Sequence, residues 1–408
     1  MRRITYVLSL ILIFMLPWED SVSIPGWGSL VRILGFVVVA LWFATVLVEG
    51  RFRRPHVFHL LVLLFLVWNL ASVFWSRDIG KTLNRLLTYG QTFLLLLVLW
   101  EVFRTAGELT ISLQAYIFGA CVLVIGTIYD YANGIVAVAY EGRYSAPGIN
   151  ANDCALMLML GLPLAMHLLL TSSPPGTSFV LRLVNLAYVP LAIFSAILTG
   201  SRTSLLAIIP FAIYLLALRQ IRLQQKALIL AILLVGLLLL LPFVPETVIS
   251  RLGTLGTSIS AGDIGGRVEL WQESIGLLED QPLLGIGSGT LPSAIGGAAH
   301  DTFVSIATET GFIGLTLFLF ILGLVIYQAF RLPRGESGLW LAVLFTWVIG
   351  VLTLSWEFRK LTWIFPLFVI IAGSAVPHRD GAKDAVQIPE GPTYGPDLST
   401  PQIGSEAT

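Results

Sequence analysis

Residues 227–243 read ALILAILLVGLLLLLPF and contain no charged side chain. An α-helix needs about 20 apolar residues to cross a bilayer core about 30 Å thick, so this run predicts a membrane span. Similar apolar stretches recur along the whole chain, at residues 4–17, 29–48, 57–75, 86–103, 111–129, 153–171, 180–198, 203–218, 302–330, 338–354 and 361–376. The sequence therefore predicts an all-α fold, a polytopic membrane helix bundle of about 12 transmembrane helices.

The composition of the 408-residue chain agrees with a lipid environment. Hydrophobic residues make up 56% of the chain and charged residues 12%, and the mean hydropathy is +0.86. A soluble domain of this length would need more charge on its surface. The formal net charge is +0, so no basic field would attract nucleic acid, and no nucleic-acid partner is expected.

The distribution of basic residues predicts the orientation of the bundle. Most of the 24 Lys and Arg residues fall on the face that would also hold both termini, which makes this face cytoplasmic. The longest segment on the other face is 244–300, a large loop between the ninth and tenth predicted helices. Residues 377–408 are polar and rich in Pro, Gly and Ser, which predicts a disordered cytoplasmic tail after a membrane domain at 1–376.

The segment TGSRTS at residues 199–204 lies between two predicted helices and is short enough to place Arg202 at the outer membrane surface. A charge at this depth either reaches lipid head groups or meets a partner in a wet cavity. An arginine that only anchors a helix end is about equally compatible with the sequence. Gly200 and the flanking hydroxyls form a polar turn suited to binding a phosphate.

A second arginine, Arg267, lies in the large loop after Gly265 and Gly266. Apolar residues recur at spacings of three and four from it onwards, so residues 267–280 are predicted to form a short amphipathic helix that ends near Pro282. Arg267 would then stand in the first turn, where free backbone amides and the helix dipole already favour an anion. The alternative is a solvated arginine on a surface helix.

The sequence HDTF, which begins at His300, marks the junction of the large loop with the tenth predicted helix. Asp301 or Thr302 can cap that helix. Because histidine accepts a proton near neutral pH, His300 is the natural general-base candidate on the outer face. Thr302, Ser305 and Glu309 form a polar stripe at helical spacing, and Glu309 is expected to face the bundle interior or a water-filled cavity.

Other motifs are weaker. The glycine-rich run at 285–289 lacks the features of a nucleotide loop and is expected to be a turn that folds the loop back toward the membrane. Two further polar clusters on the outer face comprise Trp75, Ser76, Arg77 and Asp78 with Lys81 and Arg85, and Arg143 with Asn150, Asn152 and Asp153. The sequence shows no zinc spacing, Walker loop, paired acidic cluster for Mg²⁺ or esterase elbow, which argues against an ATP-driven pump and a metal-dependent transferase.

Taken in order, these motifs resemble the O-antigen ligase and polymerase superfamily of membrane glycosyltransferases. The matching elements are GINAN at 148–152, GSR at 200–202, Arg267-x-x-x-Trp271, DQPLLGIG at 280–287, and HDxF at 300–303 followed by Glu309-x-Gly311-x-x-Gly314. The resemblance is strongest over residues 140–320, about the length of the region that the family shares.

The resemblance implies that a glycan is transferred from undecaprenyl diphosphate to an acceptor on the periplasmic face of the cell inner membrane, among membrane lipids. The acceptor is the lipid A core of lipopolysaccharide in ligases and a second lipid-linked glycan in polymerases. No cofactor and no metal are implied, because the sugar arrives already activated on the diphosphate. By motif position, Arg202 and Arg267 would hold the diphosphate and His300 would act beside them. Further substrate-binding candidates are Arg143, Asn152, Arg77, Asp301 and Glu309.

One position departs from the family pattern, which often has Asn after the histidine where this chain has Asp301. An adjacent carboxylate can raise the basicity of His300 or itself share the role of base. The sequence leaves these two assignments open.

The chemistry of the reaction explains why these residue types are needed. Breaking a sugar–diphosphate bond builds negative charge on the leaving group, which preorganised guanidinium groups stabilise, while the acceptor hydroxyl needs a base within reach. A single displacement of this kind inverts the anomeric centre. We therefore expect an inverting, metal-independent glycosyltransferase of the ligase type, with a polymerase of O-antigen or exopolysaccharide repeats as the alternative.

Two other classes of protein remain in view. A transporter of an anionic solute would need charged residues near the midplane of several helices, and the predicted spans contain few. A non-catalytic scaffold would keep its function after the loss of both Arg202 and Arg267.

Overall fold

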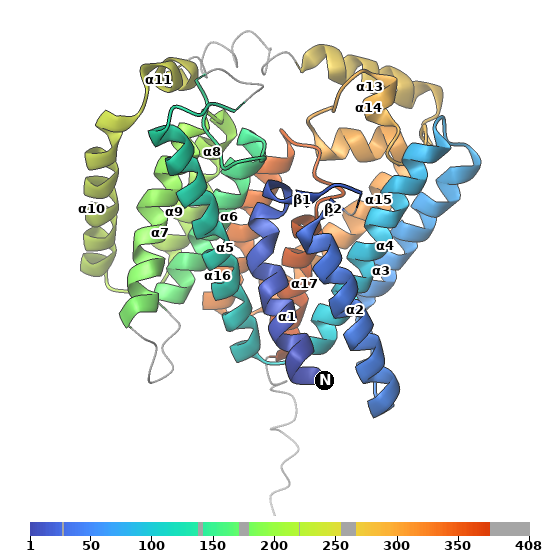
Figure 1. The fold of residues 1–408 in the computed structure, drawn as a ribbon, viewed down its shortest axis with the longest axis horizontal. Helices are drawn as coiled ribbons and strands as arrows, with labels where there is room; N and C mark the ends of the chain where they lie inside the picture. The colour runs from blue at the N-terminus through green and yellow to red at the C-terminus, as the bar shows by residue number, and fades with distance from the viewer. Residues whose placement is uncertain (27, 138–141, 171–178, 220, 254–266, 376–408) are drawn as a thin grey trace, which may run out of the picture. The chain divides into compact units, whose positions relative to one another are not determined.

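The computed structural model of the protein describes residues 1–375 except 27, 138–141, 171–178, 220 and 254–266. Within this part of the chain, nearly all regular structure is helical (Figure 1). The predicted tail at 377–408 lies outside the described residues, as do Gly265 and Gly266.

Nine helices of the described residues are long and apolar enough to cross a membrane. They are α1 (Arg2–Met15, continued by η1, Leu16–Ser21), α2 (Leu30–Glu49), α3 (Val57–Ala71, continued by η2, Ser72–Phe74), α4 (Ile79–Val102), α5 (Ala106–Ala132), α6 (Ala151–Leu170), α7 (Phe179–Leu198), α10 (Leu223–Leu240, continued by η3, Leu241–Phe243) and α15 (Thr302–Arg331). The remaining predicted spans correspond to α8 and α9 (Arg202–Leu206 and Ile208–Ala217), α16 (Arg334–Val351) and α17 (Lys360–Ala375). The prediction of an all-α, polytopic membrane bundle is confirmed.

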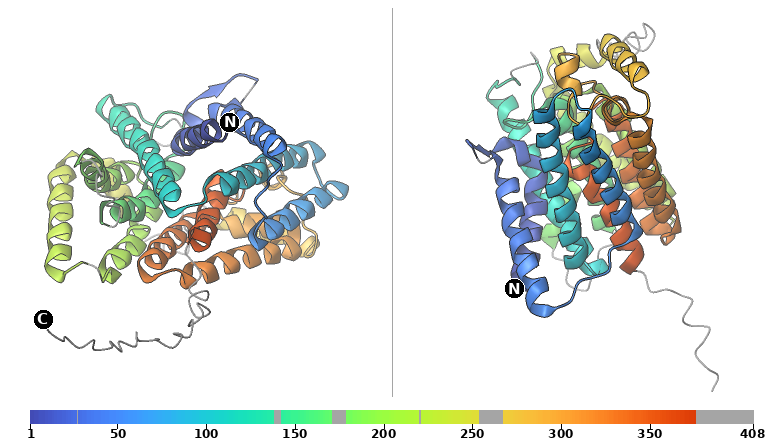
Figure 2. Two further views of the ribbon diagram at one scale, coloured as in Figure 1. Left: turned by 90° about the horizontal axis from the view of Figure 1, so that it is seen from below. Right: turned by 90° about the vertical axis from the view of Figure 1, so that its right-hand side faces the viewer.

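The long helices pack side by side as a bundle, as the two views in Figure 2 show. Helix α6 contacts α5, α7 and α16, and 83% of the residues in its most apolar 18-residue stretch are buried. Helix α10 lies at the edge of the bundle next to α7, and only 6% of the residues in its most apolar 18-residue stretch are buried. A helix that is apolar all round yet exposed is suited to lipid rather than to water.

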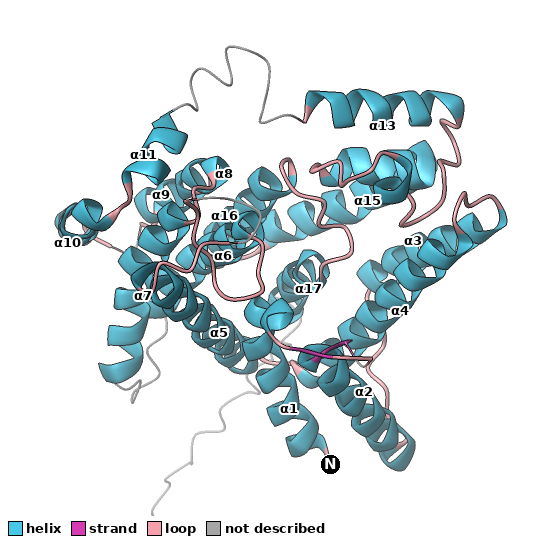
Figure 3. Cartoon of the chain, turned by 45° about the horizontal axis from the view of Figure 1, so that its top comes forward, coloured by secondary structure: helices cyan, strands magenta, loops and turns pink. Residues whose placement is uncertain are grey.

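The described part of the large loop contributes three helices, α11 (Glu246–Gly253), α13 (Val268–Asp280) and α14 (Leu291–Ala294). These lie at one end of the bundle, opposite the N-terminus (Figure 1); we call it the loop end. Helix α13 confirms the amphipathic helix predicted at 267–280. The described strands, β1 (Ser23–Ile24) and β2 (Gly28–Ser29), form a short antiparallel ladder that the sequence did not indicate (Figure 3).

Helix α15 is broken at Gly311, where φ is 68° and ψ is −177°. The break frees backbone groups that the glycine-rich part of the loop takes up. The amides of Ile286 and Gly287 donate to the carbonyls of Thr308 and Glu309, both at 2.9 Å. The loop therefore does fold back onto the bundle, and it is fixed there by hydrogen bonds to the first turns of α15.

Two predicted helices are thus interrupted. The sequence predicted one helix at 302–330, but the chain leaves helical geometry at Gly311 because the inserted loop occupies that side of α15. The stretch predicted at 203–218 is divided between α8 and α9 at Ala207.

Candidate functional site

A cavity of about 350 Å³ lies at the loop end, and we call it the His300 cavity. Its walls come from the start of α6, from α4, from the first turns of α15 and from the segment between α16 and α17. The residues that line it are Arg85, Asn150, Asp153, Leu291, Pro292, Ala298, Ala299, His300, Ser305, Glu309, Leu354, Ser355, Glu357, Phe358 and Arg359. Two of the predicted site residues, His300 and Glu309, are among them.

His300 adopts a left-handed backbone conformation, with φ of 54°, and no other described non-glycine residue has a positive φ. This conformation costs roughly 1–2 kcal/mol for an L-residue. Strain of this kind persists only where the surroundings fix it, and it concentrates at functional sites. Here the buried neighbour Ala299 accepts a hydrogen bond from the indole Nε1 of Trp271 at 2.8 Å.

That bond explains the spacing of the Arg267-x-x-x-Trp271 motif. Arg267 is the N-cap residue of α13, and Trp271 lies one turn later. By anchoring Trp271 to Ala299, the protein brings the Arg267 end of α13 close to His300. Burial and, next, the positive charge of Arg267 lower the pKa of His300 from its ordinary value of 6.5. The neutral form of His300, which can accept a proton, is therefore favoured at neutral pH.

Asp301 is the N-cap of α15, so the predicted capping role is confirmed. Its Oδ1 accepts hydrogen bonds from the amides of Phe303 at 2.8 Å and Val304 at 2.9 Å. Burial raises the pKa of Asp301, and these two amides act in the opposite direction. Asp301 is absent from the lining of the His300 cavity, which favours His300 over Asp301 as the base candidate.

Three arginines gather around the turn between α7 and α8, and we call Arg143, Arg202 and Arg251 the arginine turn. The Nε of Arg202 donates to the carbonyl of Arg251, and the Nε of Arg251 donates to the carbonyl of Gly200, both at 3.3 Å. Gly200 has φ of 62°, and a Cβ there would lie 3.2 Å from Cδ of Arg251 and 3.4 Å from Cγ of Arg143. Glycine at this position permits the close approach of the side chains.

Arg143 is almost fully buried in this turn. Its Nε donates to the carbonyl of Thr199 at 2.6 Å, and its Nη2 donates to Oδ1 of Asn152 at 2.8 Å. The structure thus brings together three of the predicted residues, Arg143, Asn152 and Arg202. Asn152 stands next to Asp153, which lines the His300 cavity, so the start of α6 connects the two places.

Arg77 lies apart from the His300 cavity and from the arginine turn. Its side chain is 43% exposed and pairs with Asp280 at 4.0 Å, and its backbone amide donates to the carbonyl of Ile286 at 3.0 Å. Nearby, Nε1 of Trp75 donates to the carbonyl of Leu284 at 3.0 Å. The polar cluster that contains Trp75 and Arg77 and the glycine-rich part of the loop therefore contact each other directly.

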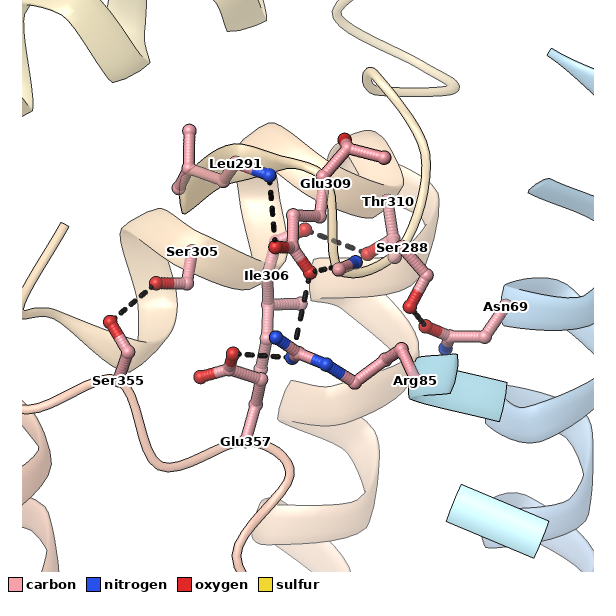
Figure 4. A network of polar contacts seen from close by, with 12 residues as sticks. Asn69, Arg85, Ser288, Leu291, Ser305, Ile306, Glu309, Thr310, Ser355 and Glu357 are labelled. Carbon is pink, nitrogen blue, oxygen red and sulfur yellow. Dashed lines mark hydrogen bonds and ion pairs between the residues drawn. The ribbon is translucent and has the colours of Figure 1, made fainter. Parts of the chain in front are cut away.

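Glu309 faces the cavity, as expected, and it is held by several partners (Figure 4). Its Oε2 accepts from the amide of Gly289 at 2.7 Å, and its Oε1 accepts from the amide of Leu291 at 3.3 Å. Arg85 lies 3.7 Å from Glu309 Oε2 and donates to Oε1 of Glu357 at 2.6 Å. The first role of Glu309 is thus to hold the returning loop against α15.

Several polar residues of the site were not predicted to be site residues. Arg85 and Asp153 were noted only as members of the two weaker polar clusters, and Arg251, Glu357 and Arg359 were not singled out. Asp153 accepts from Nη2 of Arg359 at 2.7 Å and from Nε1 of Trp356 at 2.9 Å. The segment SWEFRK at 355–360 carries the same signal as TGSRTS, namely a short polar connection with a charge between two apolar helices. That signal was available and would have pointed to Glu357 and Arg359.

Carboxylates are frequent in the His300 cavity, which raises the question of a metal ion. Within the part of the chain that the structure describes, no three His, Cys, Asp or Glu side chains are grouped so that they could hold one. The carboxylates are instead paired with arginines and backbone amides.

Comparison with known proteins adds one match. Residues 187–319 match the family model described as O-antigen ligase, a segment that includes Arg202, Arg267, His300, Asp301 and Glu309. It lies inside the region 140–320 where the resemblance was strongest, and it leaves out Arg143 and Asn152. No curated protein sequence matches the chain. The match supports the resemblance found in the sequence: residues 187–319 of this multi-pass membrane protein are similar to the O-antigen ligase family.

Proposed function

We propose that the protein is an inverting, metal-independent glycosyltransferase that moves a glycan from undecaprenyl diphosphate to the lipid A core, on the periplasmic face of the cell inner membrane. The observation that carries the proposal is the position of His300, on the wall of a cavity and next to the arginine-bearing end of α13. The family match over 187–319 supports a glycosyltransferase of the ligase and polymerase type.

In the proposed reaction, neutral His300 takes the proton of the acceptor hydroxyl. The acceptor oxygen attacks the anomeric carbon from the face opposite the diphosphate, and the bond between that carbon and the diphosphate oxygen breaks. The electron pair leaves with the diphosphate, whose added charge Arg202 and Arg267 stabilise. The new glycosidic bond has the inverted configuration.

The arginine turn supports the assignment of Arg202 to the diphosphate. Arg143 and Arg251 add two guanidinium groups beside Arg202, and the three arginines are held together by bonds to the backbone carbonyls of Thr199, Gly200 and Arg251. Arginine's planar fork of donors suits the oxygens of a diphosphate. In this proposal Arg143 and Asn152 help to shape the diphosphate site, and Arg77 contacts the glycan further out.

The alternative of a polymerase involves the same bond chemistry and differs in the acceptor. The test supplies full-length protein in lipid nanodiscs with an undecaprenyl diphosphate-linked glycan in EDTA. One arm adds the lipid A core, and the other adds a second lipid-linked glycan. Transfer to the lipid A core supports the ligase, transfer to the second glycan supports the polymerase, and transfer to neither refutes the proposal.

Variants test the residue roles in the same assay. His300→Ala is expected to lower the rate by about 10²- to 10⁴-fold, the range for removal of a general base. Arg202→Ala and Arg267→Ala are expected to raise the KM for the donor and to lower kcat. Arg334→Ala, an exposed arginine at the start of α16, serves as the control with no expected effect. Full activity of His300→Ala would remove its role as base.

A further inference from the structure

Two buried polar atoms in the wall of the His300 cavity have no hydrogen-bond partner among the described residues. They are Oε2 of Glu357 and Nε of Arg359. The other polar atoms of both side chains are engaged, since Glu357 Oε1 accepts from Arg85 at 2.6 Å and Arg359 Nη2 donates to Asp153 at 2.7 Å. Leaving such groups unpaired is unfavourable, so two residues that line the cavity carry one unsatisfied acceptor and one unsatisfied donor just beneath its surface.

The segment that carries both residues is fixed in place, so these atoms are preorganised. The carbonyl of Leu354 accepts from the hydroxyl of Thr302 at 2.7 Å, and that hydroxyl accepts from the amide of Trp356 at 2.8 Å. The hydroxyls of Ser305 and Ser355 lie 2.9 Å apart (Figure 4). The polar stripe on α15 thus holds the segment between α16 and α17 against the cavity.

The pairing of an unfilled acceptor with an unfilled donor identifies the chemistry of the ligand. A hydroxyl group can donate to Glu357 and accept from Arg359, and neighbouring hydroxyls on one sugar ring can satisfy both. Phe358 lies between these residues in sequence and also lines the cavity, and the guanidinium of Arg85 lies over its ring, 4.5 Å from the centroid. A concave site with an aromatic wall and a few fixed polar groups is typical of small-molecule recognition.

The charge of the lining argues against an anionic group in this cavity. Three carboxylate side chains line it, those of Asp153, Glu309 and Glu357, against two guanidinium groups, those of Arg85 and Arg359. Both arginines are already bonded to these carboxylates. The lining thus has one more carboxylate than guanidinium groups, and a diphosphate or a sugar acid would meet a net negative charge.

We propose that the His300 cavity is a sugar subsite that binds an uncharged sugar ring through Glu357 and Arg359 and discriminates against acidic sugars. The inference rests on the proposed function in that the bound ring belongs to one of the two substrates of the transfer. Both substrates share this chemistry: the ring is either the sugar being transferred from the donor or the sugar of the acceptor that receives it.

Binding is tested without any transfer reaction, so that its outcome is separate from that of the proposed function. Saturation-transfer NMR on the full-length protein in nanodiscs compares methyl β-glucoside with methyl β-glucuronide, which differ by one carboxylate. We expect saturation of the glucoside and at least about a tenfold weaker response of the glucuronide, because like charges repel strongly at a partly buried site. Equal responses, or no response to either sugar, would overturn the proposal.

The substitution Glu357→Gln keeps the shape of the side chain and removes its charge. It is expected to raise the glucuronide response toward that of the glucoside, a gain that a misfolded protein would not give. Glu273→Gln, on the exposed face of α13 at the same end of the bundle, is the matched control and should leave the ratio unchanged. An unchanged ratio in Glu357→Gln would contradict the role assigned to Glu357.

Kinetics with the lipid-linked substrates then identify the source of the sugar. A rise in KM for the donor in Glu357→Gln places the transferred sugar in the cavity, and a rise in KM for the acceptor places the acceptor sugar there. If neither KM changes, the cavity is not used in transfer and the proposal fails. A fall in kcat alone, with loss of the acid limb of the pH profile, would make Glu357 the base and would also overturn its role as a binding residue.

Discussion

The hydrogen bond from Nε1 of Trp271 to the carbonyl of Ala299 provides the sharpest test of how His300 is positioned. The bond measures 2.8 Å and connects α13 to the residue before His300. The substitution Trp271→Phe removes the donor and keeps an aromatic ring of similar shape. Because Ala299 is fully buried, its carbonyl would be left without this partner in an apolar setting.

The size of the effect follows from the cost of that unpaired carbonyl. Leaving a buried acceptor unsatisfied costs about 1–3 kcal/mol. If this cost falls on the conformation in which His300 is held, at about 1.4 kcal/mol for each factor of ten, the rate of transfer drops by about fivefold to a little over a hundredfold. The loss should appear mainly in kcat, because the substitution leaves both arginines assigned to the diphosphate in the chain. Arg267 is displaced only as far as α13 itself moves.

The assay is transfer from undecaprenyl diphosphate glycan by protein in nanodiscs, together with the thermal midpoint of each variant. Trp100→Phe is the matched control, since Nε1 of Trp100 also donates to a backbone carbonyl, that of Arg54, at 3.1 Å. This bond lies far along the chain from the His300 cavity, and its loss should change stability but not kcat. A rate within twofold of wild type for Trp271→Phe, or equal losses in both variants, would refute the positioning role.

Three further predictions concern the protonation of His300, the backbone break at Gly311 and the arginine turn. The transfer rate should stay level above pH 6.5 and decrease at more acidic pH as His300 becomes protonated, because burial and Arg267 lower the pKa of His300 from 6.5. The substitution Arg267→Gln removes one cause of that lowering, so the acid limb of the residual activity should move to higher pH. Gly311→Ala should lower the thermal midpoint, because a Cβ there would lie 2.0 Å from a backbone carbonyl oxygen at φ of 68°, whereas Gly323→Ala in the same helix meets nothing within 4 Å and should be neutral or stabilising. Arg251→Ala should raise the KM for the donor several-fold while leaving the acceptor KM unchanged, as measured by initial rates over a range of both substrates.

The parts of the fold that could be predicted are those that the bilayer dictates. Each apolar stretch became a helix because backbone groups in lipid must be bonded within the segment. Local signals at helix ends were equally reliable, and the cap at Asp301, the helix after Arg267 and the turn at Gly200 all lie where their residues predict. In each case the cause lies within a few residues of its effect.

The parts that could not be predicted depend on contacts between distant segments. Gly311 in an apolar helix is compatible with close packing or with a break, and only the carbonyl of Leu283 arriving from the loop decides for the break. Glu309 was expected to bind substrate, a role that stays a prediction, but its pairing with the amides of Gly289 and Leu291 could not be inferred without knowing where the loop returns.

The geometry at the start of α6 links the two halves of the proposed site. Asn152 bonds Arg143 in the arginine turn, and its neighbour Asp153 bonds Arg359 on the wall of the His300 cavity. The Cα atoms of adjacent residues such as Asn152 and Asp153 are about 3.8 Å apart. Because α6 is also largely buried, the distance between the arginine turn and the His300 cavity is fixed at this point by covalent structure. In the proposed reaction, the bond that breaks joins a sugar to a diphosphate, so its two ends require environments of opposite character a few ångströms apart. The arginine turn and a cavity whose arginines are paired with carboxylates meet that requirement, and the attacking hydroxyl must then approach the sugar from the face opposite the diphosphate, on the side of His300.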